Sequence, residues 1–213
     1  QPAQRHDRGH VRVAPPHMVK RALFVLAVAG AMGFAAWWLW TRRATVLLRP
    51  ITHTPGMALD SLHGVTVHHN GGMGAVHGRH VVDGYNVGLR YQCVEFVKRY
   101  YLEHYGHRMP NSYGHAKDFF DTTLTDGALN PDRGLLQFTN PSATRPAAGD
   151  LVVLGPWRGN PYGHVAIVSR VEHGEVEVVQ QNTADSRATY DLDLVDGRWR
   201  IDERRILGWL GKR

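Results

Sequence analysis

The hydrophobic and polar positions of this chain fall into three patterns. Residues 22–40 are almost wholly apolar and carry no charge. Residues 92–104 repeat apolar and aromatic side chains at helical spacing, which predicts a helix ending at Gly106, and residues 116–120 predict a second, short helix. Short apolar runs then predict strands at 150–154, 163–171, 175–183, 188–194, 198–202 and 206–210. A helix followed by an antiparallel sheet is an α+β plan.

The apolar run over residues 22–40 predicts one transmembrane helix. At about 1.5 Å per residue it spans about 28 Å, close to the hydrocarbon thickness of a bilayer. Trp37, Trp38 and Trp40 gather at its C-terminal end, where amphipathic rings favour the headgroup zone. A basic pair flanks each end. Cleavage at Ala29-Gly30-Ala31 would leave a very short apolar core, so we expect an uncleaved signal anchor rather than a cleaved signal peptide.

The basic charge of the chain is concentrated around this anchor. Residues 1–50 carry eight Lys/Arg and one Asp, whereas residues 51–213 carry seventeen Lys/Arg and eighteen Asp/Glu. Nucleic-acid binding is therefore not expected, because a basic footprint belongs on the folded domain. Five Lys/Arg precede the apolar run and three follow it, so the positive-inside rule favours export of the C-terminal domain. We expect a single-pass protein of a bacterial inner membrane with its domain in the periplasm.

These patterns divide the chain into four segments. Residues 1–21 read as a disordered basic segment, residues 22–40 as the anchor and residues 41–62 as a tether. Residues 63–213 form one domain without internal repeats. About 160 residues bury close to 70% of their unfolded surface, so such a domain can be stable without a disulfide.

The candidate chemistry rests on Cys93, the only cysteine of the chain, at the start of the predicted helix. His164 lies at the head of an apolar strand about seventy residues later. A thiol nucleophile needs a base that meets it in space rather than in sequence. A helix N-terminus and a nearby imidazolium lower the pKa of a thiol, so we expect this shift at Cys93. Free backbone N–H groups of the first turn, with the side chain of Gln92, can receive an oxyanion.

The imidazole of His164 also needs a partner that orients it. The following strand offers Gln180, Gln181 or Asn182. A two-residue turn at His173-Gly174 places His164 on the same face as Gln181. A three-residue loop places it with Gln180 and Asn182. Periodicity leaves both alternatives open.

Four motifs in order resemble the CHAP-type cysteine amidohydrolases of the papain-like superfamily. They are Gly-x-x-Tyr-Gln-Cys-Val-Glu-Phe at 88–96, Ala-Gly-Asp-Leu at 148–151, Gly-His-Val-Ala-Ile at 163–167 and Val-Gln-Gln-Asn at 179–182. The amidase domains of bifunctional glutathionylspermidine synthetase/amidases are similar over the same motifs, and the resemblance covers roughly residues 64–209. It implies a papain-like CHAP fold in which the helix carrying the cysteine packs on an antiparallel sheet. It also implies a cysteine nucleophile, a histidine base, and neither a cofactor nor a metal.

The resemblance assigns the roles of nucleophile and base to Cys93 and His164, and puts Gln180 where the family has an orienting Glu. Gln carries no charge, but papain-like enzymes orient their histidine with a neutral amide. Lys98 matches a basic position of the family and is a candidate for binding a substrate carboxylate. Trp157 lies in a loop before the histidine and can line the cleft. Glu95 is explained structurally, by a helical i,i+4 pair with Arg99.

The expected substrate is an amide bond, and three interpretations remain. An exported amidase beside the cell wall favours peptidoglycan, whereas the similarity to glutathionylspermidine amidases favours a small γ-glutamyl or polyamine amide. A catalytically degenerate wall-binding module is the third. A histidine cluster before the helix has no compelling metal-ligand spacing, and we expect it in a solvated loop: His63, His68, His69, His77 and His80.

Overall fold

The computed structural model describes residues 28–39 and 53–213, and it divides into two compact units, residues 1–52 and 53–213. In the first unit, residues 28–39 are helical. Among the described residues, no helix has both the length and the apolar character needed to cross a membrane. The predicted disordered segment (1–21), the rest of the predicted anchor (22–27 and 40) and residues 41–52 of the predicted tether lie outside the described residues.

The second unit is built around the helix α2 (Cys93–Tyr105), whose ends each lie one residue beyond the start and end of the predicted helix at 92–104. Gln92 is its N-cap residue in an extended conformation. Gly106 ends it in the left-handed conformation, and its N–H donates to the carbonyl of Leu102. This glycine cap is the usual way to satisfy the last carbonyls of a helix. The second predicted helix is the 3-10 turn η1 (Ala116–Phe119).

A single eight-stranded antiparallel sheet forms most of the unit. Across the sheet, the order is β11 (Arg198–Ile201), β10 (Arg187–Val195), β9 (Glu175–Val179), β8 (His164–Glu172), β7 (Leu151–Leu154), β12 (Ile206–Gly211), β6 (Leu135–Thr139) and β5 (Leu129–Asn130). The predicted α+β class is therefore confirmed, with the helix that carries Cys93 packed on an antiparallel sheet.

Both faces of the sheet are buried. One face packs against α2 through alternate residues of the central strands: Leu151, Val153, Val165, Ile167 and Leu210. The positions between them turn to the other face and form a second apolar cluster: Val152, Leu154, Ala166, Val168 and Trp209. Burial on both faces explains why β7 and β8 read as continuous apolar runs without alternation.

The second cluster is enclosed because the sheet curls. Ser142, which follows β6, and Trp199 of the edge strand β11 exchange backbone hydrogen bonds of 2.9 and 2.6 Å. The segment after β6 is thereby joined to an edge strand from the opposite half of the sheet. This pairing covers part of the edge that β11 would otherwise expose.

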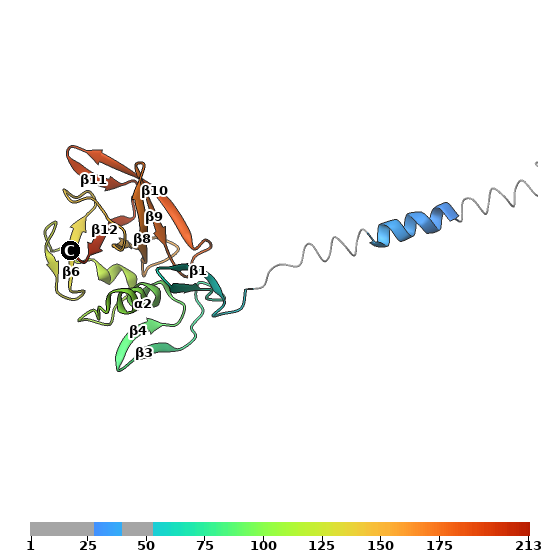
Figure 1. Cartoon of the computed structure of the whole chain (residues 1–213), viewed down its shortest axis with the longest axis horizontal. Helices are drawn as coiled ribbons and strands as arrows, with labels where there is room; N and C mark the ends of the chain where they lie inside the picture. Colours follow the sequence, from blue (N-terminus) through green and yellow to red (C-terminus); the bar gives the residue numbers. More distant parts are fainter. Residues whose placement is uncertain (1–27, 40–52) are drawn as a thin grey trace, which may run out of the picture. The chain divides into compact units, whose positions relative to one another are not determined.

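Two hairpins that the sequence did not predict lie before α2. They are β1 (Ala58–Leu62) with β2 (Val65–His68), and β3 (Arg79–Val82) with β4 (Tyr85–Leu89). In Figure 1, α2 lies between the second hairpin and the sheet, and it contacts both β4 and β8. These strands are short and rich in polar residues, so their periodicity is weak.

The predicted tether (41–62) is wrong for residues 58–62, which form β1 of the folded unit. Asp60 of this strand accepts a 2.8 Å hydrogen bond from Arg187 of β10, which ties the hairpin to the sheet. The turn between β1 and β2 is His63-Gly64, with both residues at positive φ. His173-Gly174 was recognised as a turn of the same kind, so the sequence carried a usable signal here.

Candidate active site

Cys93 lies at the first position of α2, with its side chain against the core between the helix and the sheet. β4 approaches this turn so closely that a Cβ on Gly88 would lie 2.9 Å from the Cα of Glu95, and Gly88 itself has φ 142°. Only glycine fits this crossing. The glycine five residues before the cysteine is therefore part of how the chain positions Cys93.

Burial raises the pKa of the Cys93 thiol above its ordinary value. Three backbone N–H groups act in the opposite direction, those of Val165, Val94 and Cys93 itself. The contact with Val165 places the sulfur beside the residue that follows His164. The sequence therefore correctly predicts that the helix start and the strand start meet.

His164 begins β8 and is buried, with 6% of its surface exposed. Its Nε2 lies 3.1 Å from Oε1 of Gln180. Nε2 of Gln180 donates to the carbonyl of Asp185, so Oε1 is the acceptor toward the imidazole. The Nε2 of His164 then carries the hydrogen, which leaves Nδ1 with a free lone pair. Burial lowers the pKa of His164 from 6.5 to about 4, and Arg205 contributes in the same direction.

The expectation of a lowered thiol pKa is wrong for this structure, because desolvation outweighs the helix terminus and its N–H groups. Both shifts favour uncharged forms of Cys93 and His164 near neutral pH. A neutral thiol and a neutral imidazole are the resting forms that follow. General-base catalysis, in which an imidazole takes the proton as the sulfur attacks, is the chemistry that these two forms allow.

Neither predicted turn length explains how His164 comes to face Gln180. The β8–β9 turn has two residues, with Glu172 opposite Glu175, and this register alone would place His164 opposite Thr183 and on the same face as Gln181. A β-bulge between Val168 and Arg170 shifts the pairing by one residue, so that Ile167 lies opposite Val179. One extra residue in one strand exchanges the faces of all residues beyond it.

Gln92 and Asn182 lie together beside the nucleophile. Nδ2 of Asn182 donates to Oε1 of Gln92 at 2.6 Å, and Nε2 of Gln92 donates to the carbonyl of Ala75 at 2.8 Å. Asn182 has φ 64°, which turns its side chain away from the strand direction, and its Oδ1 accepts from Asn70. The amide of Gln92 is thus held in one orientation, with one N–H left over.

Gln181, which the sequence offered only as an alternative partner of His164, lies beside Gln92 instead. It is fully buried and bonds both the backbone of Gln92 and the carboxylate of Glu95. Glu95 also accepts from Arg99 at 2.8 Å and from His80 at 2.9 Å. The predicted Glu95–Arg99 pair is confirmed, but it is buried and belongs to a larger network.

Lys98 is not brought to the nucleophile. Its ammonium is buried, donates to the carbonyls of Asn86 and Ser112, and lies 4.9 Å from the ring centroid of Tyr85. Burial lowers the pKa of Lys98 to about 8. With two of its three donors bonded inside the protein, this lysine fastens β4 to the loop that follows α2. It is therefore neither an exposed helix lysine nor placed to bind a substrate carboxylate at Cys93.

Trp157 lies in the loop between β7 and β8, where its backbone pairs with Asn160. The guanidinium of Arg205 lies 4.9 Å from its ring centroid. Arg205 is also the charge that acts on His164. The indole ring therefore holds a cation near the base, which the sequence alone did not indicate.

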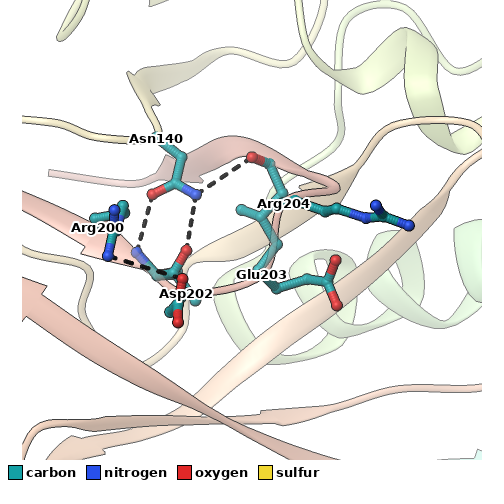
Figure 2. Close-up of a pocket in the computed structure, with 7 residues that line it drawn as sticks. Asn140, Arg200, Asp202, Glu203 and Arg204 are labelled. Carbon is teal, nitrogen blue, oxygen red and sulfur yellow. Dashed lines mark hydrogen bonds and ion pairs between the residues drawn. The ribbon is translucent and has the colours of Figure 1, made fainter.

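A pocket of about 250 Å³ is formed away from these residues, around the end of β11 and the following turn. Figure 2 shows Asn140 at its wall, with its side chain bonded to the backbone of Ile201 and Ile206. Arg200 and Asp202 pair across it at 3.8 Å. Its lining shares no residue with the Cys93–His164 arrangement: Asn140, Arg200, Ile201, Asp202, Glu203, Arg204 and Ile206.

Comparison with known families gives the class of this domain. Residues 83–182 match the family model of the CHAP domain, and this range includes Cys93, His164 and Gln180. The match to the CHAP domain lies within the second unit and spans its candidate site.

The similar proteins include synthetases, one of them a bifunctional synthetase/amidase. The chain is 30% identical over 149 residues to the bifunctional glutathionylspermidine synthetase/amidase of Escherichia coli (strain K12), an alignment that covers 62% of this chain and 23% of that protein. It is 27% identical over 145 residues to the trypanothione synthetase of Crithidia fasciculata, covering 62% and 22%. The chain thus spans about a quarter of the length of these relatives.

Among solved structures, the chain is similar to Ly7917 in complex with the hydrolyzing product of MDP. That likeness has 28% sequence identity and a TM-score of 0.25, and it covers 33% of this chain and 29% of the other. A second structure of Ly7917 gives 25% identity and a TM-score of 0.24 over the same shares. Likenesses of this extent bear on neither fold nor substrate.

Proposed function

We propose that this chain is a cysteine amidase that hydrolyses an amide bond with Cys93 as nucleophile, His164 as general base and Gln180 as the residue that orients the base. One observation carries the proposal. The thiol of Cys93 contacts the backbone of Val165, and the imidazole of the adjacent His164 is held through Nε2 by Gln180. The free Nδ1 is the atom left to accept the thiol proton.

The reaction follows from these atoms. Nδ1 of His164 takes the proton of Cys93 as the sulfur bonds to the substrate carbonyl, and the carbonyl electrons move to oxygen. In this proposal the N–H of Cys93 and the remaining N–H of Gln92 stabilise that oxyanion. The imidazolium returns its proton to the leaving amine as the C–N bond breaks. Water, activated by the same imidazole, then hydrolyses the thioester and releases the acid.

For the substrate, we favour an amide of peptidoglycan. The predicted anchor at 22–40 and the charge balance around it support a domain held on the periplasmic side of a bacterial inner membrane. An amidase at that position meets cell-wall peptides. The exposed aromatic side chains of Tyr113 and Tyr162, which belong to loops beside the start of β8, offer surface for such a polymer.

A second candidate is a small γ-glutamyl or polyamine amide. The observation that favours it is the similarity to glutathionylspermidine synthetase/amidase, which spans 62% of the chain. Such a substrate would suit a domain on the cytoplasmic side of the membrane. The two candidates therefore differ in topology as well as in substrate.

The deciding experiment incubates the full chain in detergent with purified murein sacculi and, separately, with glutathionylspermidine. Mass spectrometry identifies the products, and newly formed amino groups give the rate. We expect murein fragments from the wild type and none from the Cys93→Ala variant. Cleavage of glutathionylspermidine alone would select the second candidate. Equal activity of wild type and Cys93→Ala would contradict the nucleophile assignment.

Topology is tested independently of activity. Protease is added to intact spheroplasts and to lysed ones, and an antibody to the C-terminus follows the chain. We expect digestion in intact spheroplasts, as an exported domain requires. Protection until lysis would contradict export and favour the small-amide candidate.

A further inference from the structure

Three consecutive residues after β9 contact different parts of the candidate site. Gln180 bonds the imidazole of His164, and Asn182 bonds the side chain of Gln92. Gln181, between them, bonds neither of these groups. Its Nε2 donates to the backbone carbonyl of Gln92 at 3.0 Å, one residue before the nucleophile.

The surroundings of Gln181 leave its amide one orientation. Oε1 accepts from the N–H of His68 in β2 at 2.7 Å, and Nε2 also donates to Oε2 of Glu95 at 3.0 Å. The side chain is 1% exposed. It therefore joins β2, the N-terminus of α2 and the end of β9 inside the protein, where a lost hydrogen bond is not replaced by water.

We infer that Gln181 is the positioning residue for the nucleophile, as Gln180 is for the base. The inference rests on the proposed function and adds a residue to it. The carbonyl of Gln92 is part of the peptide that carries the N–H of Cys93, so holding this carbonyl sets where both the N–H and the sulfur point. Asn182 bonds the side chain of the same residue. Its backbone carbonyl accepts from Gln181 and, at 3.2 Å, from the N–H of Phe96 in the first turn of α2, so Gln181 adds the contact that comes from outside the helix.

Gln137 is a matched control, because it is an equally buried glutamine with equivalent bonds elsewhere. It is 1% exposed, accepts from Asp121 and Asn130, and donates to the carbonyl of Asp121. It lies in β6 and contacts neither Cys93 nor His164 through any of these bonds. Gln181→Met and Gln137→Met thus each remove three side-chain hydrogen bonds of a buried amide at nearly constant volume.

The test compares the two variants in the full chain by melting temperature and by amide-cleavage kinetics. Both should melt at similarly reduced temperatures. Only Gln181→Met should lose kcat, by about 10- to 100-fold with KM little changed, since a misplaced nucleophile costs rate rather than binding. The pH below which activity falls should stay as in wild type in Gln181→Met and shift in Gln180→Met, because only Gln180 bonds the imidazole. Equal kcat losses in Gln181→Met and Gln137→Met, or an unchanged kcat in Gln181→Met, would overturn the inference.

Alkylation of Cys93 by iodoacetamide separates this inference from the proposed function. It needs no amide substrate, and the chain has no other cysteine. At pH 7 we expect slower alkylation in Gln181→Met than in Gln137→Met, because the thiol moves away from the N–H of Val165 and from His164. If the wild type cleaves no amide but the two variants still differ in this way, the proposed function fails and the positioning role stands. Equal alkylation rates would overturn the positioning role.

Discussion

The two halves of the candidate site are held by different kinds of interaction. On the nucleophile side, the first turn of α2 is fastened by polar side chains, with Gln181 and Asn182 on Gln92, and Arg99 on Glu95. On the base side, His164 stands at the start of an apolar strand with one side-chain hydrogen bond, to Gln180. Position is thus set by a network in one half and by sheet packing in the other.

Because of this difference, substitutions on the two sides should affect different properties: the position of Cys93 on one side and the protonation of His164 on the other. Hydrogen bonds to a backbone fix where an atom lies, so changes on the nucleophile side should act on position and stability. The protonation of the buried imidazole is set first by desolvation, and then by the hydrogen bond to Gln180 and the charge of Arg205. Changes on the base side should therefore act on pH dependence and on the rate of proton transfer.

The largest effect is expected for removal of the base. In His164→Asn, no group takes the thiol proton, and general-base catalysis is worth about 10²- to 10⁴-fold. We expect kcat for amide cleavage to fall by this factor while the chain stays folded by circular dichroism. Retention of activity within a few-fold would show that another base serves Cys93.

The next largest effect belongs to the nucleophile side. Glu95→Leu leaves the buried guanidinium of Arg99 without its carboxylate, and breaking one partner of a buried pair costs about 3–5 kcal/mol. Urea unfolding measures the loss. The control is Glu172→Leu, which removes an exposed pair with Arg170 and should cost at most about 1 kcal/mol. Similar losses in the two variants would contradict a special role for the network.

The buried base should also make stability depend on pH. The pKa of His164 is about 4 in the folded state against 6.5 as its ordinary value, so between these values the unfolded chain binds more protons. Wild type should lose stability as pH falls from 6.5 to 4, by on the order of 3 kcal/mol relative to His164→Asn. Urea unfolding of both proteins at pH 4.5 and 7 gives the difference. Parallel losses in the two proteins would contradict the lowered pKa.

The smallest effect is expected for Gln180, the residue that bonds the base, and it tests directly whether the base side acts through protonation. In Gln180→Glu, a carboxylate beside Nε2 stabilises the imidazolium and raises the pKa of His164. A stronger base should increase kcat by about 3- to 10-fold near neutral pH. Gln180→Met, which removes the hydrogen bond, should change kcat in the opposite direction. A fall in both variants would mean that orientation by the amide outweighs charge.

Much of this site was predictable from local sequence. The helix over residues 93–105 and its Gly106 cap, the meeting of Cys93 with the strand that begins at His164, and the resemblance that selected Gln180 all depend on short motifs. The hairpins before α2 were missed because their strands are short and polar. Residues 58–62 were wrongly assigned to a tether, although His63-Gly64 is a recognisable turn.

The sequence alone pointed to the type of chemistry that we propose, because a candidate nucleophile, a candidate base and the element that carries each can be read within a few residues. Three properties depended on contacts between distant segments. The bulge between Val168 and Arg170 decided which amide side chain faces His164. Burial decided that the thiol and the imidazole favour their neutral forms. The bond to β4 directs the ammonium of Lys98 away from Cys93. Register, desolvation and burial are properties of the assembled sheet and helix, so no single segment encodes them.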